Sequence, residues 1–440
     1  MLVRLDETDV RFETALREDR GLADLDGRDA ALAWELAAGT TRRRRSLDAV
    51  LAVFSDHRLD RMAAPTRAAL RLGAYQLLFL ERVPKHAAVD ESVGLARTDG
   101  RRTAGFVNAV LRRVAAEGAA MLTRLGAGES VASLGVRLSY PDWLVARWVE
   151  EWGPERAAAM LEAGNRPPER CVRVNTLKST IDEARARLRS DGFTVSTAGA
   201  GSAWRGTPEA LLVEGGRLER SAAFREGLVT PQSRASQLVG AVAAGGAPAP
   251  GRIADLCAAP GAKTAHLAAR LPAAHITAVE LDPGRAADLR RLLARLGVTT
   301  ADVTEQDATA LGVDHDGLYQ LVLLDAPCSG LGTVATRPDL RWRRRPQDAE
   351  RLAEVQRTLL RRAARLLSPG GAVVYAVCTL DRRETVDVVL TVADAAGLLH
   401  DDLGSTYTGL VDPRLPTALA TMPDRDQTSG FFMARLRRAP

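Results

Sequence analysis

Three patterns of hydrophobic and polar positions follow one another along the chain. In the first 125 residues or so, apolar residues recur at helical spacing, for example Val107, Val110, Leu111 and Val114. Spacing of i, i+3, i+4 and i+7 places these side chains on one face of a helix. The stretch 70–80 is more continuously apolar and is typical of a helix at the centre of a bundle. The pattern predicts an all-helical domain over residues 1–125.

A mixed pattern begins at about residue 140. Residues 171–175 and 192–195 have the composition of short strands, and residues 181–188 have the spacing of a helix between them. Alternation of this kind predicts a small α/β connecting domain, which we place at residues 140–222.

After Gly251, short apolar runs alternate with amphipathic segments. The expected strands are 252–256, 275–281, 321–325 and 372–377, and the longest expected helix is 348–367. The glycine- and proline-rich segment 244–251 is expected to be a loop inside this region, because the helix before it would pack on the sheet. Strands alternating with helices predict a parallel sheet with right-handed crossovers, an α/β fold that we assign to residues 223–440.

Composition adds limits to this division. A chain of 440 residues exceeds the usual size of one hydrophobic core, and 46% hydrophobic with 26% charged residues argues against disorder. The net charge is only +5, but 60 lysines and arginines include several clusters such as 42–45 and 341–345. A nucleic-acid partner is compatible with this charge, which many proteins carry without one.

The cysteines and histidines indicate no metal site and no disulfide framework. The four cysteines form no Cys-x-x-Cys pair, and the six histidines are scattered. The N-terminal residues lack the apolar core of an export signal, and no apolar run is long enough to span a bilayer. We expect a cytoplasmic protein with no membrane partner.

Candidate chemistry gathers where the expected strands end. The first strand leads into the loop Asp255-Leu256-Cys257-Ala258-Ala259-Pro260-Gly261-Ala262-Lys263-Thr264, which has neither the glycine pattern of a dinucleotide site nor that of a Walker loop. An ordinary turn is an equally good interpretation of this loop taken alone. Ligands of open parallel sheets bind at the carboxyl ends of the strands, so several polar strand ends should converge on one crevice.

Two further carboxylates change the interpretation of this loop. Glu280 ends the second strand, where an acid commonly holds two ribose hydroxyls, and Asp307 follows a short third strand and can accept a bond from an adenine amine. Each acid alone is more often a solvated loop residue. Together they predict an adenosine-containing cofactor without a pyrophosphate cradle, which points to S-adenosyl-L-methionine.

Two cysteines follow later strand ends: Cys328 in Asp325-Ala326-Pro327-Cys328-Ser329-Gly330 and Cys378 in Tyr375-Ala376-Val377-Cys378-Thr379. A free cysteine is usually a small buried apolar residue, and this interpretation stays open for both. Beside an adenosine site, however, a pair of thiols suggests covalent catalysis, because the thiolate is the most nucleophilic ordinary side chain near neutral pH.

The sequence runs around these residues resemble a known family. DLCAAPGAKT, AVELD, LLDAPCSGLGTVATRPDLRW and VYAVCTL are similar to the RNA cytosine-5 methyltransferases that use two cysteines. RDAALAWELAAGTTRRR, LRLGAYQLLFLERVP and GFVNAVLRRV resemble the NusB-like helical domain fused to the RsmB branch of that family. The resemblance implies a class I, Rossmann-like methyltransferase domain and methylation of ribosomal RNA, free or in a precursor particle, by an enzyme that needs only to be a monomer.

The resemblance also implies roles for individual residues. Cys378 would be the nucleophile that adds to carbon 6 of cytosine, and Cys328 would assist breakdown of the adduct. Asp325 would bond the cytosine edge, and Lys263 would hold the base or lower the pKa of a thiol. The cofactor positions would be Cys257, Ala258, Ala259, Pro260, Gly261, Ala262, Lys263, Glu280, Asp307 and Asp325.

The chain departs from the family pattern in several places, one of which is Ser233, which follows Gln232 where aspartate is usual. Ala262 stands where a second glycine is usual, Val377 and Thr379 flank Cys378 where threonine and serine are usual, and Thr385 replaces an asparagine after Glu384. These changes leave both cysteines in place but question the hydrogen bonds that support Cys378.

RNA contact is predicted in the run after the Cys328 loop. Arg337, Arg341, Trp342 and Arg343 combine guanidinium groups with an aromatic ring, which can bind phosphate and stack on a base. A solvated helix start is the alternative for this run. For the chain as a whole, a transfer-RNA or DNA methylase and a non-catalytic RNA-binding or antitermination factor remain rival hypotheses. A methylase of the DNA type would use Cys328, rather than Cys378, as its nucleophile.

Overall fold

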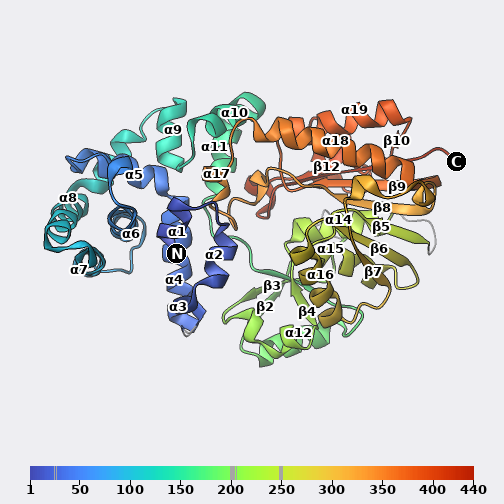
Figure 1. Ribbon diagram of the computed structural model, residues 1–440, viewed down its shortest axis with the longest axis horizontal. Coiled ribbons are helices and arrows are strands. Elements are labelled where there is room, and N and C mark those ends of the chain that lie inside the picture. The colour runs from blue at the N-terminus through green and yellow to red at the C-terminus, as the bar shows by residue number, and fades with distance from the viewer. Residues whose placement is uncertain (24, 26, 199–203, 205, 247–250) are drawn as a thin grey trace. The chain divides into compact units, whose positions relative to one another are not determined.

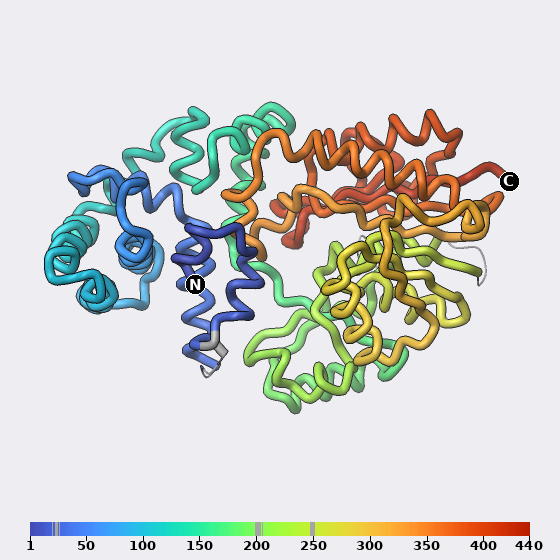
Figure 2. The backbone as a smooth tube through the Cα atoms, in the orientation of Figure 1, coloured from blue at the N-terminus to red at the C-terminus, as the bar shows by residue number. Residues whose placement is uncertain are grey.

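The computed structural model describes residues 1–23, 25, 27–198, 204, 206–246 and 251–440. Contacts divide the chain into two compact units. The first contains residues 1–166 and 334–346, and the second contains residues 167–333 and 347–440 (Figures 1 and 2). The segment 334–346, which follows the Cys328 loop in the sequence, therefore belongs to the first unit, although the residues before and after it belong to the second.

The first unit is helical, as the spacing of apolar residues predicts. Its core includes Leu70, Val107 and Leu111, all buried. In chain order its helices are α1 (Leu2–Glu7), α2 (Phe12–Glu18), α3 (Arg20–Ala23), α4 (Gly27–Arg42), α5 (Arg44–Phe54), η1 (Leu59–Arg61), α6 (Ala64–Phe79), α7 (Lys85–Ala96), η2 (Arg97–Asp99), α8 (Arg101–Leu125), α9 (Val131–Leu138), α10 (Asp142–Trp152), α11 (Pro154–Ala163) and α17 (Leu340–Arg343).

Helices α10 and α11 lie in the first unit, although the predicted connecting domain begins at residue 140. The apolar face of α10, which includes Leu144 and Trp148, is buried where α10 packs against α9 and α11. The first strand of the second unit begins only at Cys171. The sequence pattern thus changes at about residue 140, two helices before the second compact unit begins.

A small antiparallel sheet opens the second unit. It consists of β1 (Cys171–Val174), β2 (Thr194–Thr197), β3 (Ala210–Glu214) and β4 (Val229–Pro231) in the order β2-β3-β1-β4. Its helical elements are α12 (Ile181–Ser190), η4 (Leu218–Arg220) and α13 (Ala222–Arg225). The strands and helix expected between residues 171 and 195 are confirmed, with β2 displaced by two residues.

A large mixed sheet forms the rest of the second unit. Its strands are β5 (Arg252–Asp255), β6 (His275–Glu280), β7 (Ala301–Glu305), β8 (Tyr319–Asp325), β9 (Leu367–Val377), β10 (Leu399–His400), β11 (Val411–Asp412), β12 (Leu415–Thr421) and β13 (Phe431–Arg437). Their order is β11-β12-β13-β9-β8-β5-β6-β7, and β10 pairs with β13. Five neighbouring strands of this sheet, β9, β8, β5, β6 and β7, are mutually parallel. This confirms the predicted α/β, Rossmann-like architecture.

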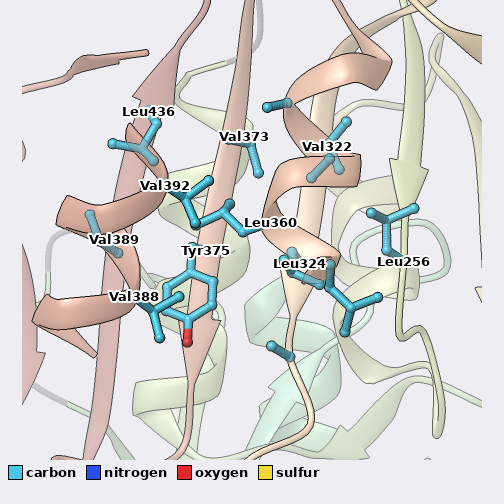
Figure 3. Close-up of a cluster of buried hydrophobic side chains, with 14 of the residues drawn as sticks. Leu256, Val322, Leu324, Leu360, Val373, Tyr375, Val388, Val389, Val392 and Leu436 are labelled. Atoms are coloured by element: carbon cyan, nitrogen blue, oxygen red, sulfur yellow. The ribbon is translucent and has the colours of Figure 1, made fainter. Parts of the chain in front are cut away.

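Helices cover both faces of this sheet (Figure 1). The helices of this part of the chain are α14 (Arg234–Ala244), α15 (Ala262–Arg270), α16 (Pro283–Leu296), α18 (Asp348–Leu366), α19 (Val386–Ala396) and the short α20 (Pro423–Asp426). Short 3-10 turns lie in its connections: η5 (Ala308–Ala310), η6 (Val313–His315), η7 (Leu331–Thr333), η8 (Arg382–Glu384) and η9 (Thr408–Leu410). Figure 3 shows how Leu360 of α18 and Val388, Val389 and Val392 of α19 pack on Val373 and Tyr375 of β9. The predicted loop 244–251 lies partly outside the described residues, because 247–250 are not described.

The antiparallel strands near the C-terminus were not expected from the sequence pattern. In β13, Arg435 and Arg437 interrupt the apolar run, and both form ion pairs with Asp401. These pairs allow charged side chains in a strand that otherwise has a buried pattern, which is why periodicity alone does not reveal it.

The described residues include no helix long and apolar enough to cross a membrane. Within the same residues, no group of three or more histidine, cysteine, aspartate or glutamate side chains is placed to hold a metal ion.

Candidate active site

Acidic residues end neighbouring strands at one edge of the large sheet. Asp255 ends β5, Glu280 ends β6 and Asp325 ends β8. β5 lies between β6 and β8 and is parallel to both, so these three carboxylates lie at the same edge of the sheet. β5 is the strand at which the chain order reverses, the usual position of a ligand crevice in open α/β sheets.

The loop between β5 and α15 needs glycine at position 261. Gly261 has a φ of +109°, a conformation that side chains with a Cβ rarely adopt. A Cβ on Gly261 would also lie 2.5 Å from Cδ1 of Leu289. Ala262, where the family pattern has glycine, is the first residue of α15 and is only half-buried, so its methyl group is accommodated there.

Glu280 connects this loop to the next strand. Its Oε2 accepts a hydrogen bond from the backbone N–H of Ala259 at 3.2 Å, and its Oε1 accepts one from the N–H of Asp282 at 3.1 Å. Arg285 forms an ion pair with the same carboxylate at 3.4 Å. Asp307, after β7, is exposed and caps η5 by accepting from the backbone N–H of Thr309 at 2.8 Å.

Asp255 has a buried carboxyl group, one oxygen of which accepts no hydrogen bond from the described residues. Its Oδ2 accepts a hydrogen bond from Oγ1 of Thr264 at 2.7 Å, whereas Oδ1 has no hydrogen-bond partner among the described residues. Burial raises the pKa of Asp255 to about 7, and the nearby charge of Asp325 acts in the same direction. A buried polar oxygen without a protein partner is unfavourable unless a ligand or water satisfies it.

Lys263 and Asp325 form a charged pair beside an aromatic ring. Nζ of Lys263 lies 2.6 Å from Oδ2 of Asp325 and 5.2 Å from the ring centroid of Phe431. The side chain of Asp325 is 27% exposed, so the pair can reach a ligand as well as each other.

The structure brings the two strand-end cysteines together. Sγ of Cys328, after β8, lies 3.3 Å from Sγ of Cys378, after β9, and both residues are half-buried. The hydrogen bond with Cys378, together with burial, raises the pKa of the Cys328 thiol well above its ordinary value. Either sulfur can donate the proton in this contact, so the two thiols titrate as a pair.

Hydrogen bonds hold the two cysteine loops against each other despite the departures from the family pattern. Ser329 Oγ donates to Thr379 Oγ1 at 3.0 Å, and the N–H of Gly332 donates to the carbonyl of Cys378 at 3.0 Å. Thr385 Oγ1 donates to the carbonyl of Asp381 at 2.9 Å. The threonines at positions 379 and 385 therefore take part in local support of the site.

Comparison with known proteins matches three regions of the chain. A model of the family "16S rRNA methyltransferase RsmB/F" matches residues 247–437, one of the NusB family matches 2–116, and one of a ferredoxin-like domain of RsmF/B-like methyltransferases matches 140–214. The ribosomal RNA small subunit methyltransferase B of Sodalis glossinidius is 33% identical, over 94% of this chain and 91% of its own length. The chain belongs to the RsmB/F family.

Two solved structures have a fold similar to that of this chain. The crystal structure of the protein PH0851 covers 99% of this chain and 97% of its own length, with a TM-score of 0.82 and 25% identity. A methyltransferase homologue from Pyrococcus horikoshii covers 71% of this chain and 99% of its own, with a TM-score of 0.59 and 30% identity. The fold of this chain is therefore shared with both solved structures.

The arginine and tryptophan run of this RsmB/F chain is placed differently from the prediction. Arg341 is fully buried in the first unit, and its guanidinium group donates to Asn165 Oδ1 at 2.8 Å and to the carbonyl of Gly164 at 3.1 Å. The indole N–H of Trp342 donates to the carbonyl of Thr41 at 2.6 Å. The predicted RNA contact by Arg341 is wrong for this conformation, because its donors face protein carbonyls and not solvent.

The other two arginines of the run stay nearer to the surface. Arg343 forms ion pairs with Asp9 at 3.0 Å and Asp339 at 3.4 Å, and Arg337 lies 3.5 Å from Glu13. Both side chains remain partly exposed, and their contact with RNA stays a prediction.

Sequence patterns did not reveal two residues beside the cysteines, Phe431 and Gln356. Gln356 is fully buried on α18, between the apolar residues Leu352 and Leu359. A polar residue on the apolar face of an amphipathic helix is the signal that could have identified Gln356. Phe431 begins β13, the strand hidden by its arginines.

Proposed function

We propose that this chain transfers a methyl group from S-adenosyl-L-methionine to carbon 5 of a cytosine in small-subunit ribosomal RNA. The proposal rests chiefly on one observation, the 3.3 Å approach of the Cys328 and Cys378 sulfurs at the sheet edge that carries the Lys263–Asp325 pair. The names of its relatives in the RsmB/F family support ribosomal RNA as the substrate.

The residues at this edge fit S-adenosyl-L-methionine, which supplies the methyl group when it is bound. The loop from Cys257 to Lys263, together with Glu280, Asp307 and Asp325, would hold it. Two observations support the fit: Gly261 has no Cβ in a tightly packed turn, and Asp255 Oδ1 is a buried acceptor without a partner among the described residues. A buried acceptor suits the positively charged amino group of an amino-acid moiety.

Cytosine needs a nucleophile because its carbon 5 is not reactive enough to accept a methyl group directly. In our proposal the thiolate of Cys378 adds to carbon 6, and the electrons of the double bond between carbons 5 and 6 become available at carbon 5. Lys263 and Asp325 are the donor and the acceptor at this edge that would hold the polar edge of the base.

Cys328 would then release the product. Its thiolate takes the proton from carbon 5, the electrons of that bond restore the double bond, and the bond from carbon 6 to Cys378 breaks with its electrons returning to sulfur. Once Cys378 is bound as a thioether, it no longer carries a charge and is a poorer hydrogen-bond partner. One cause of the raised pKa of Cys328 is then removed, so Cys328 ionises more readily when it is needed as a base.

We also propose a role for each domain of the chain. We propose residues 1–125 as a NusB-like RNA-binding domain, 140–222 as a connecting domain and 223–440 as the catalytic domain. Arg101, Arg102 and Arg112 are exposed along α8 and are available for phosphate contacts. A base that reaches the two thiols must leave its stack, so the target cytosine is expected in an accessible part of the RNA.

Methyl transfer to RNA tests the proposal directly. Wild-type protein, Cys378→Ala and Cys328→Ala are incubated with labelled S-adenosyl-L-methionine and unmodified small-subunit RNA, and the RNA is digested to nucleosides. We expect label in 5-methylcytosine with the wild type and none with Cys378→Ala. Labelling of another nucleoside, or no transfer to this RNA or to its precursor particle while RNA binding persists, would contradict the proposal.

A further inference from the structure

A buried polar cluster lies beneath the loop that carries Cys328. It consists of Gln356 of α18, Tyr375 of β9 and Glu384 of η8, whose side chains are all fully buried. Figure 3 shows Tyr375 on the face of β9 covered by α18 and α19, with Val388 and Leu360 beside it. The hydroxyl group of Tyr375 donates to the backbone carbonyl of Glu384 at 2.6 Å, which fixes η8 relative to the strand before Cys378.

This cluster holds the residues on both sides of Cys328. The backbone N–H of Ser329 donates to Glu384 Oε1 at 2.8 Å. Nε2 of Gln356 donates to the carbonyl of Pro327 at 2.9 Å and to the same Glu384 oxygen at 3.0 Å. A glutamate and a glutamine, joined to each other, thus hold the peptide groups immediately before and after the thiol.

Burial of Glu384 is unfavourable by itself. Desolvation raises the pKa of Glu384 above its ordinary value, and Oε2 has no hydrogen-bond partner among the described residues. An apolar residue at such a position would ordinarily stabilise a core at least as well. What the carboxylate does provide is an acceptor for the amide that follows Cys328, and this contact bears on the position of the thiol.

We propose that Glu384 and Gln356 are positioning residues for Cys328 and act in the release of the methylated base. The inference rests on the proposed function, in which Cys328 removes the carbon 5 proton and Cys378 departs as a thiolate. Hydrogen bonds to Pro327 and Ser329 keep the Cys328 sulfur 3.3 Å from that of Cys378, close to the carbon next to the one that Cys378 attacks. Loss of these bonds would displace Cys328 while the strand that leads to Cys378 stays in place.

The predicted signature is a slow release step after a normal first methyl transfer. For Glu384→Ala we expect steady-state turnover to fall roughly tenfold to a hundredfold, the range typical for a misplaced catalytic group. The amplitude of the first turnover should persist, and a protein–RNA adduct should accumulate on a denaturing gel. Glu384→Gln should recover most of the turnover, because its amide oxygen can still accept from Ser329. Glu354→Gln, an exposed position on the same helix as Gln356, serves as the matched control and should behave as wild type.

Combining Glu384→Ala with Cys328→Ala distinguishes a positioning role of Glu384 from a general structural role. In Cys328→Ala, which already lacks the release base, adding Glu384→Ala should change neither adduct level nor turnover further. If Glu384→Ala does not fold, Gln356→Leu gives the same test from the other side of the loop. Equal loss of first and later turnovers without adduct in a folded variant would overturn the positioning role. Absence of 5-methylcytosine with the wild type would instead refute the proposed function, so the two failures are distinguishable.

Discussion

Truncation of Arg341 should destabilise the first unit rather than weaken RNA binding. The guanidinium group lies 3.9 Å above the ring of Tyr140 and donates to several oxygens of this unit. Their distances from its nitrogens are 2.8 Å for Asn165 Oδ1, 3.1 Å for the Gly164 carbonyl, 3.2 Å for the Ser139 carbonyl, 3.3 Å for the Arg42 carbonyl and 3.4 Å for the Val334 carbonyl. Burial lowers the pKa of Arg341 to about 10, so it remains charged at neutral pH.

The size of the effect follows from these contacts. A hydrogen bond from a charged group contributes about 1.5–3 kcal/mol, but the desolvation of a buried guanidinium group offsets part of the sum. Removing one side of such a buried polar arrangement typically costs about 3–5 kcal/mol. For a unit of this size, that corresponds to a decrease in the unfolding midpoint of roughly 6–20 °C for Arg341→Ala.

Calorimetry and RNA titration together test this reasoning. Arg341→Ala should lower the midpoint, and Arg341→Lys should lower it less, because lysine keeps the charge but lacks the planar fork of donors. Arg82→Ala, exposed elsewhere in the same unit, should change the free energy of unfolding by less than about 0.5 kcal/mol. An unchanged midpoint for Arg341→Ala with clearly weaker RNA binding would refute the buried role and restore the prediction made from the sequence.

Two further predictions concern the cofactor edge. Gly261→Ala should weaken S-adenosyl-L-methionine binding measured by calorimetric titration, because the added methyl group meets Leu289 at 2.5 Å and the φ of +109° is unfavourable for alanine; unchanged affinity would contradict the packing argument. The pKa of Asp255 is raised from 3.8 to about 7, so its contribution to stability is fully present below pH 3.8 and is lost as pH rises toward 7. Relative to Asp255→Asn, the wild-type free energy of unfolding should therefore fall across this window, by at most about 1.4 kcal/mol per pH unit. A constant difference between the two proteins in chemical denaturation would show that folding does not raise the pKa of Asp255.

The strand ends of the second unit could be predicted because their signals are local. Apolar runs of strand length stop at Asp255, Glu280, Asp325 and Val377, and parallel pairing then places these ends at one edge. The proximity of Cys328 and Cys378 follows from the adjacency of β8 and β9 in the sheet. Periodicity and the rule for ligand crevices were therefore sufficient for the main features of the candidate site.

The features that escaped prediction depend on distant partners. Arg341 looks like a solvated residue in a basic run, and only the carbonyls of residues far earlier in the chain make its burial possible. Gln356 and Glu384 likewise depend on a hydrogen bond between residues 28 positions apart. A buried polar residue is defined by its partners, and a single sequence gives no direct signal of such pairs.

The central claim is that Cys378 forms the covalent bond to cytosine and Cys328 releases it. The most direct measurement is peptide mapping by mass spectrometry of the adduct trapped between the Cys328→Ala variant and its RNA substrate. The proposed function predicts a cytidine attached to the peptide that contains Cys378. An adduct that forms with Cys378→Ala and maps to Cys328 would reverse the two roles and contradict the account.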